Sequence, residues 1–172
     1  MFDLDRETVI EIKDTLDMAR EAGLKIATAE SCTGGLVAAA LTHVAGASLV
    51  FERGFVTYSN EAKTEMLGVP AGLIKAHGAV SEQVARTMAE GALARSRADL
   101  TVSVTGIAGP GGGTREKPVG LVHFASAARD GETIAIHFNF GDIGREDVRF
   151  QSLLTALGLL RQQMAGNYPS VA

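Results

Sequence analysis

The sequence predicts an α/β fold, a single three-layer α/β/α domain in which helices cover both faces of a mixed β-sheet. Segments with apolar residues at helical spacing alternate with short apolar runs, as is typical of layered α/β domains. Two late apolar runs flank Asp130-Gly131, a pair that favours a tight turn and hence an antiparallel hairpin in the C-terminal half. A chain of 172 residues can bury one sizeable core, so we expect one domain over residues 1–172.

The composition argues against several classes of protein. Apolar residues make up 46% of the chain and charged residues 21%, which is typical of a globular rather than a disordered protein. The net charge of −4 argues against broad electrostatic binding to nucleic acid or to an anionic membrane. The single cysteine cannot form an internal disulfide and fits a reducing compartment. The chain start lacks the features of a signal peptide, and no apolar run approaches the about 20 residues that span a bilayer, so we expect a cytoplasmic protein.

Two helices and two extended segments are expected in the first third of the chain. Apolar residues recur at helical spacing before Gly23, which stands where glycine often ends a helix. The expected elements are a helix at 3–22, a strand at 25–29, an alanine-rich helix at 36–44 and an extended run at 49–58.

Capping and turn residues mark the elements of the remaining chain. Asn60 is expected to cap a short helix that Gly68 ends, and Ser81 is expected to cap a longer helix. The expected elements are helices at 61–67 and 82–97, strands at 100–105, 120–128 and 133–140, and a final helix marked by Leu153, Leu157, Leu160 and Met164. From Gly166 onward the tail is expected to fray.

The segment at 29–35, Ala-Glu-Ser-Cys-Thr-Gly-Gly, is the first candidate site. It lies between a predicted strand and a predicted helix, so unpaired backbone N–H groups and the positive end of the helix dipole would surround it. Ser31 and Cys32 place a hydroxyl and a thiol in that field, and the two glycines allow a ligand to approach the backbone. The alternative is that Ser31 or Thr33 only caps the helix.

A second candidate is the segment Tyr58-Ser59-Asn60-Glu61-Ala62-Lys63. Lys63 would lie in the first turn of a helix, where the dipole disfavours a cation. If this amine is also shielded from water, its neutral form is favoured, and a neutral lysine can act as a general base toward a serine hydroxyl. Tyr58 could form a hydrogen bond with either partner. The alternative is an exposed lysine paired with Glu61 or Glu65.

The glycine-rich loop at 106–114 is the third candidate. Five glycines after a strand suggest anion binding through backbone amides, and the alternative is a mobile surface loop. The loop matches neither G-x-x-x-x-G-K-[ST] nor G-x-G-x-x-G, which argues against a kinase, an ATPase and a dinucleotide oxidoreductase.

Arginines near the start of the final helix form the last candidate. Arg145 and Arg149, close to Asp142, could clamp a carboxylate or a phosphate. The alternative is that they form solvated ion pairs with neighbours such as Glu146 and Asp147.

Other catalytic motifs are missing from the sequence. The four histidines are scattered and have no clustered cysteines or acids beside them, so a metal centre has little support. Ser31 is not part of G-x-S-x-G, and no lysine follows it at S-x-x-K spacing. A partnership between Ser31 and Lys63 would therefore depend on the fold. A pairing of Cys32 with a histidine also stays open.

Five sequence blocks, taken in order, resemble the CinA C-terminal domain family over roughly residues 7–164. The blocks are Ala29-Glu30-Ser31-Cys32-Thr33-Gly34-Gly35, Tyr58-Ser59-Asn60-Glu61-Ala62-Lys63, Gly78-Ala79-Val80-Ser81, Thr105-Gly106-Ile107-Ala108-Gly109-Pro110 and Lys117-Pro118-Val119-Gly120. The resemblance implies an amidohydrolase that converts nicotinamide mononucleotide and water to nicotinic acid mononucleotide and ammonia. It also implies no cofactor or metal, a pyridine nucleotide as the small-molecule partner, and assembly as a homo-oligomer. Similar proteins occur alone or fused behind a second domain, and we expect the stand-alone form because this chain is too short for the fusion.

The resemblance also assigns roles to individual residues. It places the nucleophile on Ser31, the base on Lys63 and an assisting tyrosine on Tyr58. Backbone amides around residues 33–35 would hold the oxyanion of the acyl-transfer step. The residues expected to contact the substrate are Glu30, Cys32, Thr33, Gly34, Gly35, Asn60, Thr105, Gly106, Gly109 and Arg145.

One departure from the family pattern affects Arg145. The family usually has Gly-Asp-Arg before the last helix, whereas this chain has two extra residues between Asp142 and Arg145.

Two other functions remain as alternatives to the amidohydrolase. One is a nucleotide-binding or partner-binding module without turnover, connected with competence for DNA uptake or DNA damage. The other is a hydrolase that uses Cys32.

Overall fold

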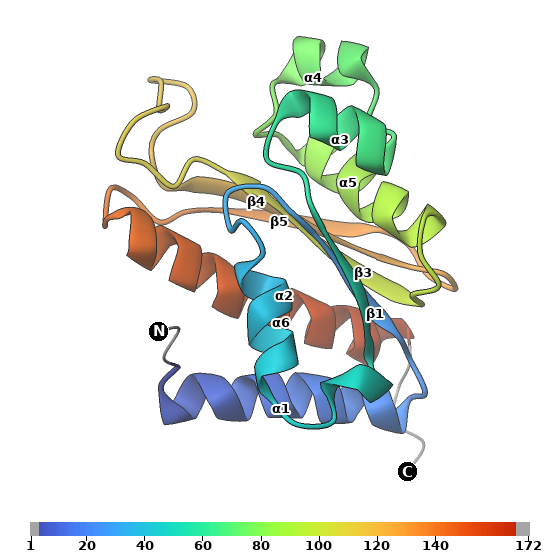
Figure 1. The fold of residues 1–172 in the computed structure, drawn as a ribbon. Coiled ribbons are helices and arrows are strands. Elements are labelled where there is room, and N and C mark those ends of the chain that lie inside the picture. The colour runs from blue at the N-terminus through green and yellow to red at the C-terminus, as the bar shows by residue number, and fades with distance from the viewer. Residues whose placement is uncertain (1–3, 168–172) are drawn as a thin grey trace.

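A five-stranded sheet lies between two layers of helices in the computed structural model, which describes residues 4–167 (Figure 1). The strand order is β2-β1-β3-β4-β5. The strands are β1 (Ile26–Glu30), β2 (Phe51–Val56), β3 (Leu100–Gly106), β4 (Leu121–Ala128) and β5 (Ile134–Asn139). The helices are α1 (Arg6–Glu21), α2 (Leu36–His43), the short 3₁₀ helix η1 (Ala47–Leu49), α3 (Asn60–Leu67), α4 (Ala71–His77), α5 (Glu82–Ala94) and α6 (Arg145–Asn167).

The sheet is mixed, as the sequence predicts. β1 is parallel to both β2 and β3, whereas β4 is antiparallel to β3 and to β5. The hairpin predicted around Asp130-Gly131 is the β4–β5 pair, which confirms the antiparallel element in the C-terminal half.

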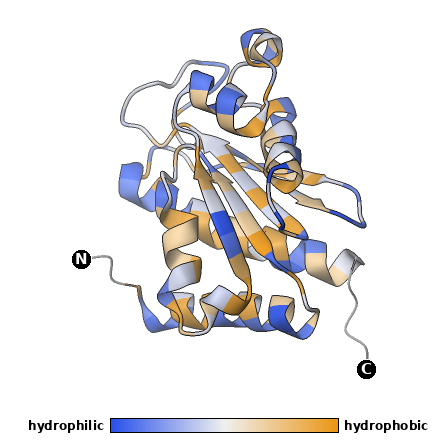
Figure 2. Cartoon of the chain, turned by 45° about the vertical axis from the view of Figure 1, so that its right-hand side comes forward, coloured by the Kyte–Doolittle hydropathy of each residue, from blue (hydrophilic) through white to orange (hydrophobic). Residues whose placement is uncertain are grey.

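Each face of the sheet has its own apolar core. α1, α2 and α6 cover one face and bury large side chains such as Ile12, Leu41 and Leu157. On the other face, α5 packs against β4 through alanines, including Ala85 and Ala125, whose small side chains allow the helix to approach the sheet closely. Apolar residues gather on the strands, and hydrophilic residues lie on the outward sides of the helices (Figure 2).

The chain crosses the sheet on opposite faces before and after β2. The connection from β1 to β2 runs through α2, and the connection from β2 to β3 runs through α3, α4 and α5 on the other face. Ligands of open α/β sheets bind outside the carboxyl ends of the strands at such a reversal. The carboxyl end of β1 is followed directly by Ser31, so the first candidate segment occupies this position.

Most predicted elements are present, with boundaries that differ by a few residues. The helix α4 was not predicted, because the preceding helix was expected to end at Gly68 before Pro70 and no element was assigned to residues 71–77. The cap of α3 was assigned wrongly: Ser59, not Asn60, is the N-cap, and its hydroxyl accepts a hydrogen bond from the Ala62 N–H at 3.0 Å. The helix predicted at 82–97 ends at Ala94.

The ends of the chain also differ from the expectation. α6 begins at Arg145 and continues through Asn167, so the expected fraying at Gly166 is wrong for the last two described residues. The remainder of that tail, 168–172, and residue 3 of the first predicted helix lie outside the described residues.

Candidate active site

Ser31 lies in the turn between β1 and α2 and is 8% exposed. Its backbone N–H donates to the Val104 carbonyl of β3 at 2.9 Å, which extends the β1–β3 pairing by one residue beyond the end of β1. Its carbonyl accepts a hydrogen bond from the Gly34 N–H at 3.0 Å. The nucleophile candidate is therefore fixed to the sheet on one side and to its own turn on the other.

Lys63 reaches Ser31 from α3. The Nζ atom lies 3.0 Å from Ser31 Oγ, and the residue is only 1% exposed. It also lies 2.8 Å from the Thr57 carbonyl oxygen, and 3.4 Å from the carbonyl oxygens of Tyr58 and Ser59. The alternative of an exposed lysine paired with Glu61 or Glu65 is therefore wrong.

Burial of Lys63 favours its neutral form, which is the form that can act as a base. Burial lowers the pKa of the Lys63 amine below its ordinary value of 10.5, because desolvation penalises the charged form. A neutral amine has two N–H donors and one lone pair. In the neutral form, two of the three carbonyl oxygens near Nζ can accept these donors, and the lone pair can then accept the hydrogen of the Ser31 hydroxyl.

Cys32 is buried beside this pair and does not have the properties of a nucleophile. Burial, with a smaller contribution from the negative charge of Glu30, raises the pKa of the Cys32 thiol from 9.0 to about 12. The thiolate is the reactive form of cysteine, so this thiol stays protonated and unreactive near neutral pH. The burial of Cys32 and the raised pKa of its thiol argue against a hydrolase that uses this residue.

Glu30 does not lie in the pocket, contrary to the substrate contact that was expected. The residue is fully buried, and its carboxylate accepts hydrogen bonds from three backbone N–H groups at the start of α2. Because one of these belongs to Gly35, and the Gly34 N–H is bound to the Ser31 carbonyl, the two glycine amides predicted to hold an oxyanion are both occupied. The Cys32 N–H faces the sulfur of its own side chain, and within residues 4–167 the Thr33 N–H has no acceptor.

A pocket of about 270 Å³ opens directly over Ser31 and Lys63. Asn60 lines one side, and the glycine-rich loop contributes Gly106 and Gly109, as the sequence suggested for this loop. Thr105 also lines the pocket, but its hydroxyl donates to the Ala79 carbonyl at 2.8 Å and holds a wall residue in place. Of the remaining residues expected to contact substrate, Cys32 and Arg145 line the pocket, whereas Thr33, Gly34 and Gly35 belong to the turn behind it.

The Tyr58 side chain does not contact Ser31 or Lys63. It is 60% exposed, and its hydroxyl oxygen accepts a hydrogen bond from Arg145 Nη2 at 3.0 Å. This hydroxyl therefore forms no hydrogen bond with Ser31 or Lys63, and the assisting role that the resemblance gives to Tyr58 stays a prediction. The hydrogen bond between Tyr58 and the lysine amine is made by the Tyr58 backbone carbonyl and not by its side chain.

Both arginines at the start of α6 bind backbone carbonyls of the site. Arg145 Nη1 donates to the Gly109 carbonyl at 2.9 Å, so the two extra residues after Asp142 still deliver this arginine to the pocket. Arg149 Nη2 donates to the Thr33 carbonyl at 2.9 Å behind the serine turn. Among the described residues neither arginine forms a salt bridge, so the solvated ion pairs considered from the sequence are absent there.

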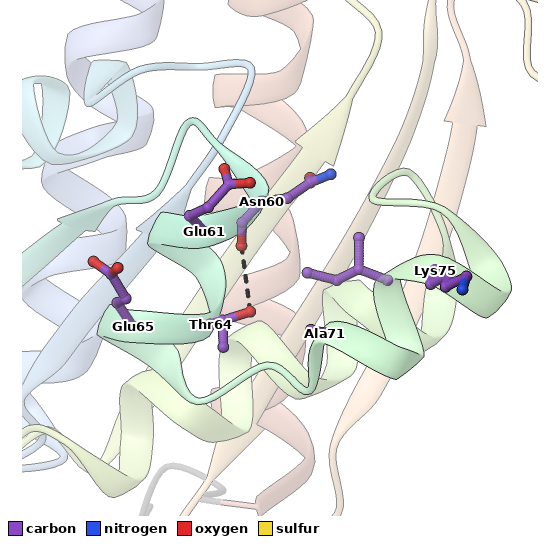
Figure 3. Close-up of a pocket in the computed structure, with 7 residues that line it drawn as sticks. Asn60, Glu61, Thr64, Glu65, Ala71 and Lys75 are labelled. Carbon is purple, nitrogen blue, oxygen red and sulfur yellow. Dashed lines mark hydrogen bonds between the residues drawn. The ribbon is translucent and has the colours of Figure 1, made fainter.

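A second pocket adjoins the first. It has a volume of about 390 Å³ and lies between α3 and α4, with side chains of Glu61, Thr64 and Lys75 around it (Figure 3). Asn60 lines both pockets. Sequence reasoning missed this pocket because α4, which forms one of its walls, was not predicted.

Residues 4–167 contain no group of three or more histidine, cysteine, aspartate or glutamate side chains arranged to hold a metal ion. No helix in the same range is long and apolar enough to cross a membrane.

Comparison with known proteins places the chain in a family. The profile of the CinA C-terminal domain matches residues 10–164. The chain belongs to the CinA family. A putative competence-damage inducible protein of Caldicellulosiruptor bescii is 48% identical over 165 residues, which cover 95% of this chain and 39% of that protein. A CinA-like protein of Citrifermentans bemidjiense is 54% identical over 166 residues, covering 95% of this chain and 39% of that protein. The chain thus spans about two fifths of the length of these two relatives.

Solved CinA structures have the same fold. The crystal structure of the competence/damage inducible protein CihA from Agrobacterium tumefaciens superposes with a TM-score of 0.92 at 50% identity, covering 94% of this chain and 98% of that one. A CinA superfamily protein of Escherichia coli superposes with a TM-score of 0.84 at 35% identity, covering 94% of both chains. The CinA fold predicted from the five sequence blocks is confirmed.

Proposed function

We propose that this CinA chain hydrolyses the carboxamide of nicotinamide mononucleotide, releasing ammonia and nicotinic acid mononucleotide through an acyl-enzyme on Ser31. The observation that carries the proposal is the buried contact of 3.0 Å between Lys63 Nζ and Ser31 Oγ at the floor of a pocket. A hydroxyl is a weak nucleophile unless a neighbouring base removes its proton, and a buried neutral amine supplies that base.

In the acylation step, Ser31 Oγ attacks the carboxamide carbon while its proton passes to the lone pair of Lys63 Nζ. The developing oxyanion accepts a hydrogen bond from the backbone N–H of Cys32, which lines the pocket and donates to no other described residue. Such donors contribute about 2.7–4 kcal/mol each to transition-state stabilisation. The protonated Lys63 then gives its proton to the leaving nitrogen, so ammonia departs and an ester on Ser31 remains.

Deacylation repeats the sequence with water as the nucleophile. Lys63, neutral again, accepts a proton from a water molecule that attacks the ester carbon. Collapse of the second tetrahedral intermediate breaks the bond to Ser31 Oγ, which takes the proton back from Lys63. The products are the carboxylic acid and the starting form of the enzyme.

The shape and charge of the pocket support a small anionic amide as the substrate. A volume of about 270 Å³ accommodates a pyridine ring with part of its sugar. Arg145 stands at the exposed side of the pocket, where its guanidinium can pair with the phosphate of a mononucleotide. Asn60 adds an amide that can bind the ring carboxamide or the ribose hydroxyls.

Incubation of the pure protein with a panel of pyridine nucleotides and their ribosides tests the proposal. Ammonia is measured with a coupled enzyme assay, and the acid product is identified by mass spectrometry. We expect turnover of nicotinamide mononucleotide by the parent protein and none by Ser31→Ala. Nucleotide binding without any ammonia release would instead favour the nucleotide-binding or partner-binding module considered from the sequence.

A further inference from the structure

Glu30 is a fully buried carboxylate in a position where sequence reasoning expected a substrate contact. Burial of an ionised group is costly unless hydrogen bonds compensate for the lost hydration. Here Oε2 accepts from the N–H groups of Gly35 and Val37, each at 3.0 Å, and Oε1 accepts from the Ala38 N–H at 2.8 Å. The carboxylate therefore occupies the anion-binding position at the start of α2, where backbone donors and the helix dipole both favour negative charge.

This arrangement differs from an ordinary helix cap. The N-cap residue of α2 is Gly35, which has no side chain to accept a hydrogen bond. The acceptor comes instead from Glu30, the last residue of β1, five positions earlier. The side chain thus joins the two ends of the intervening turn. Gly34 and Gly35 have φ angles of 59° and 97°, so the turn uses a left-handed backbone that glycine adopts without strain.

The turn closed in this way contains the proposed nucleophile. Ser31 follows Glu30 directly, and the main chain of Glu30 is also fixed, because its carbonyl accepts the Thr57 N–H at 2.8 Å. Thr57 in turn offers its own carbonyl to Lys63 Nζ. One residue therefore connects the strand that carries Ser31, the start of α2 and the segment that leads to Lys63.

We propose that Glu30 is a positioning residue that holds Ser31 Oγ in line with Lys63 and keeps the start of α2 closed to substrate anions. Because the three amides that Glu30 binds are already satisfied, they are not available to the substrate, and we place the oxyanion at the Cys32 N–H and the substrate phosphate near Arg145. This inference rests on the proposed function for its catalytic consequence. The clamp itself is a property of the fold.

Two variants of Glu30 separate positioning from simple folding. Glu30→Gln keeps the volume of the side chain but turns one acceptor into an NH₂ donor that faces the N–H groups of α2. We expect kcat to fall by about 100-fold, as for a misplaced reacting group, with little change in KM. Glu30→Ala removes the carboxylate and leaves a space with three unpaired donors, which sodium formate can fill.

Formate rescue gives a readout that ordinary destabilisation does not. In Glu30→Ala, formate should raise the melting temperature and restore part of kcat, whereas the same concentration of sodium chloride should do neither. Leu41→Ala is the matched control, because it opens a cavity in α2 that exposes no unpaired amides. Formate should affect this control and the parent protein no more than chloride does.

A serine-reactive fluorophosphonate probe keeps this test independent of the amidase assay. We expect the probe to label Ser31 more slowly in Glu30→Gln and Glu30→Ala than in the parent, and formate to restore labelling only in Glu30→Ala. Unchanged labelling and unchanged kcat in Glu30→Gln would overturn the positioning role. The same conclusion would follow if formate changed neither the melting temperature nor the labelling rate of Glu30→Ala. A parent protein that is labelled but releases no ammonia would overturn the proposed amidase reaction and leave the role of Glu30 supported.

Discussion

Lys63 Nζ lies 3.0 Å from Ser31 Oγ, although 32 positions separate the two residues in the chain. Neither belongs to a recognised hydrolase motif, and both are buried at the carboxyl end of the same pair of parallel strands. The proposed transfer of the serine proton depends on a neutral lysine, and this requirement gives the first two expectations.

Amidase activity should rise with pH through the lowered pKa of Lys63. Burial holds the pKa of this amine below 10.5, and only its neutral form can accept the serine proton. The pH profile of kcat for nicotinamide mononucleotide should therefore show an alkaline rise at that pKa. Lys63→Met should remove activity across the whole pH range. A profile that is flat from neutral to alkaline pH in the parent would contradict a lysine base.

The same titration should appear in the stability of the fold. In the unfolded chain the lysine keeps a pKa near 10.5, so between the lowered folded pKa and 10.5 the unfolded state binds more protons. The free energy of unfolding contributed by this residue therefore rises with pH through that window. Urea denaturation of the parent and of Lys63→Met at a series of pH values should show the slope in the parent alone. Parallel curves would mean that the lysine titrates normally.

Substitutions of the two neighbouring nucleophile candidates should have opposite effects on amidase activity. Ser31→Ala should lower kcat by about 10⁴-fold or more, as removal of a nucleophile does in serine hydrolases, with little change in melting temperature. Cys32→Ser should retain most of the activity, because the pKa of the thiol is raised to about 12 and the thiol takes no part in the chemistry. Ammonia release measures both. Loss of activity in Cys32→Ser with a normal melting temperature would return Cys32 to the mechanism.

Arg145 should act mainly on binding of the substrate phosphate. Arg145→Ala should raise KM for the mononucleotide by about 10- to 100-fold, the equivalent of one charge-assisted contact. KM for the riboside, which lacks the phosphate, should change much less. Tyr58→Phe removes the hydroxyl that accepts from Arg145 Nη2, and should raise KM by a smaller factor.

A double-mutant cycle tests whether Tyr58 acts through Arg145. Tyr58→Phe should have almost no further effect in the Arg145→Ala protein, because its partner is already gone. Additive effects on KM would mean that the tyrosine contacts the substrate independently.

Two glycines in helices offer a matched pair for stability. A Cβ at Gly91 of α5 would lie 2.1 Å from the Leu67 carbonyl oxygen, whereas a Cβ at Gly72 of α4 would meet nothing within 4 Å. Gly91→Ala should therefore destabilise the fold by about 1–3 kcal/mol or more through overpacking. Gly72→Ala should stabilise it by about 0.5–1 kcal/mol, because alanine is the better helix former at an exposed site. Denaturant midpoints measure both, and equal midpoints would contradict the close packing of α5 against α3.

The sequence alone determined those features that depend on residues close together in the chain. Apolar spacing predicted most helices and every strand, and Asp130-Gly131 predicted the hairpin between β4 and β5. The five ordered blocks identified the CinA family and drew attention to Ser31 and Lys63. A helix such as α4, short and preceded by Pro70, is stabilised by packing on α5 more than by its own pattern, so it was missed.

The tertiary structure alone decided which of these groups meet. The parallel register pairs Glu30 with Val56, which sets Ser31 beside Thr57 and so brings Lys63, six residues later, over the serine hydroxyl. The distance between Lys63 Nζ and Ser31 Oγ depends on hydrogen bonds between strands, which local sequence patterns do not predict. The role of Glu30 was also decided by the tertiary structure. A carboxylate at the end of a strand can face a substrate or the start of a helix, and only the path of α2 shows that Glu30 faces the helix.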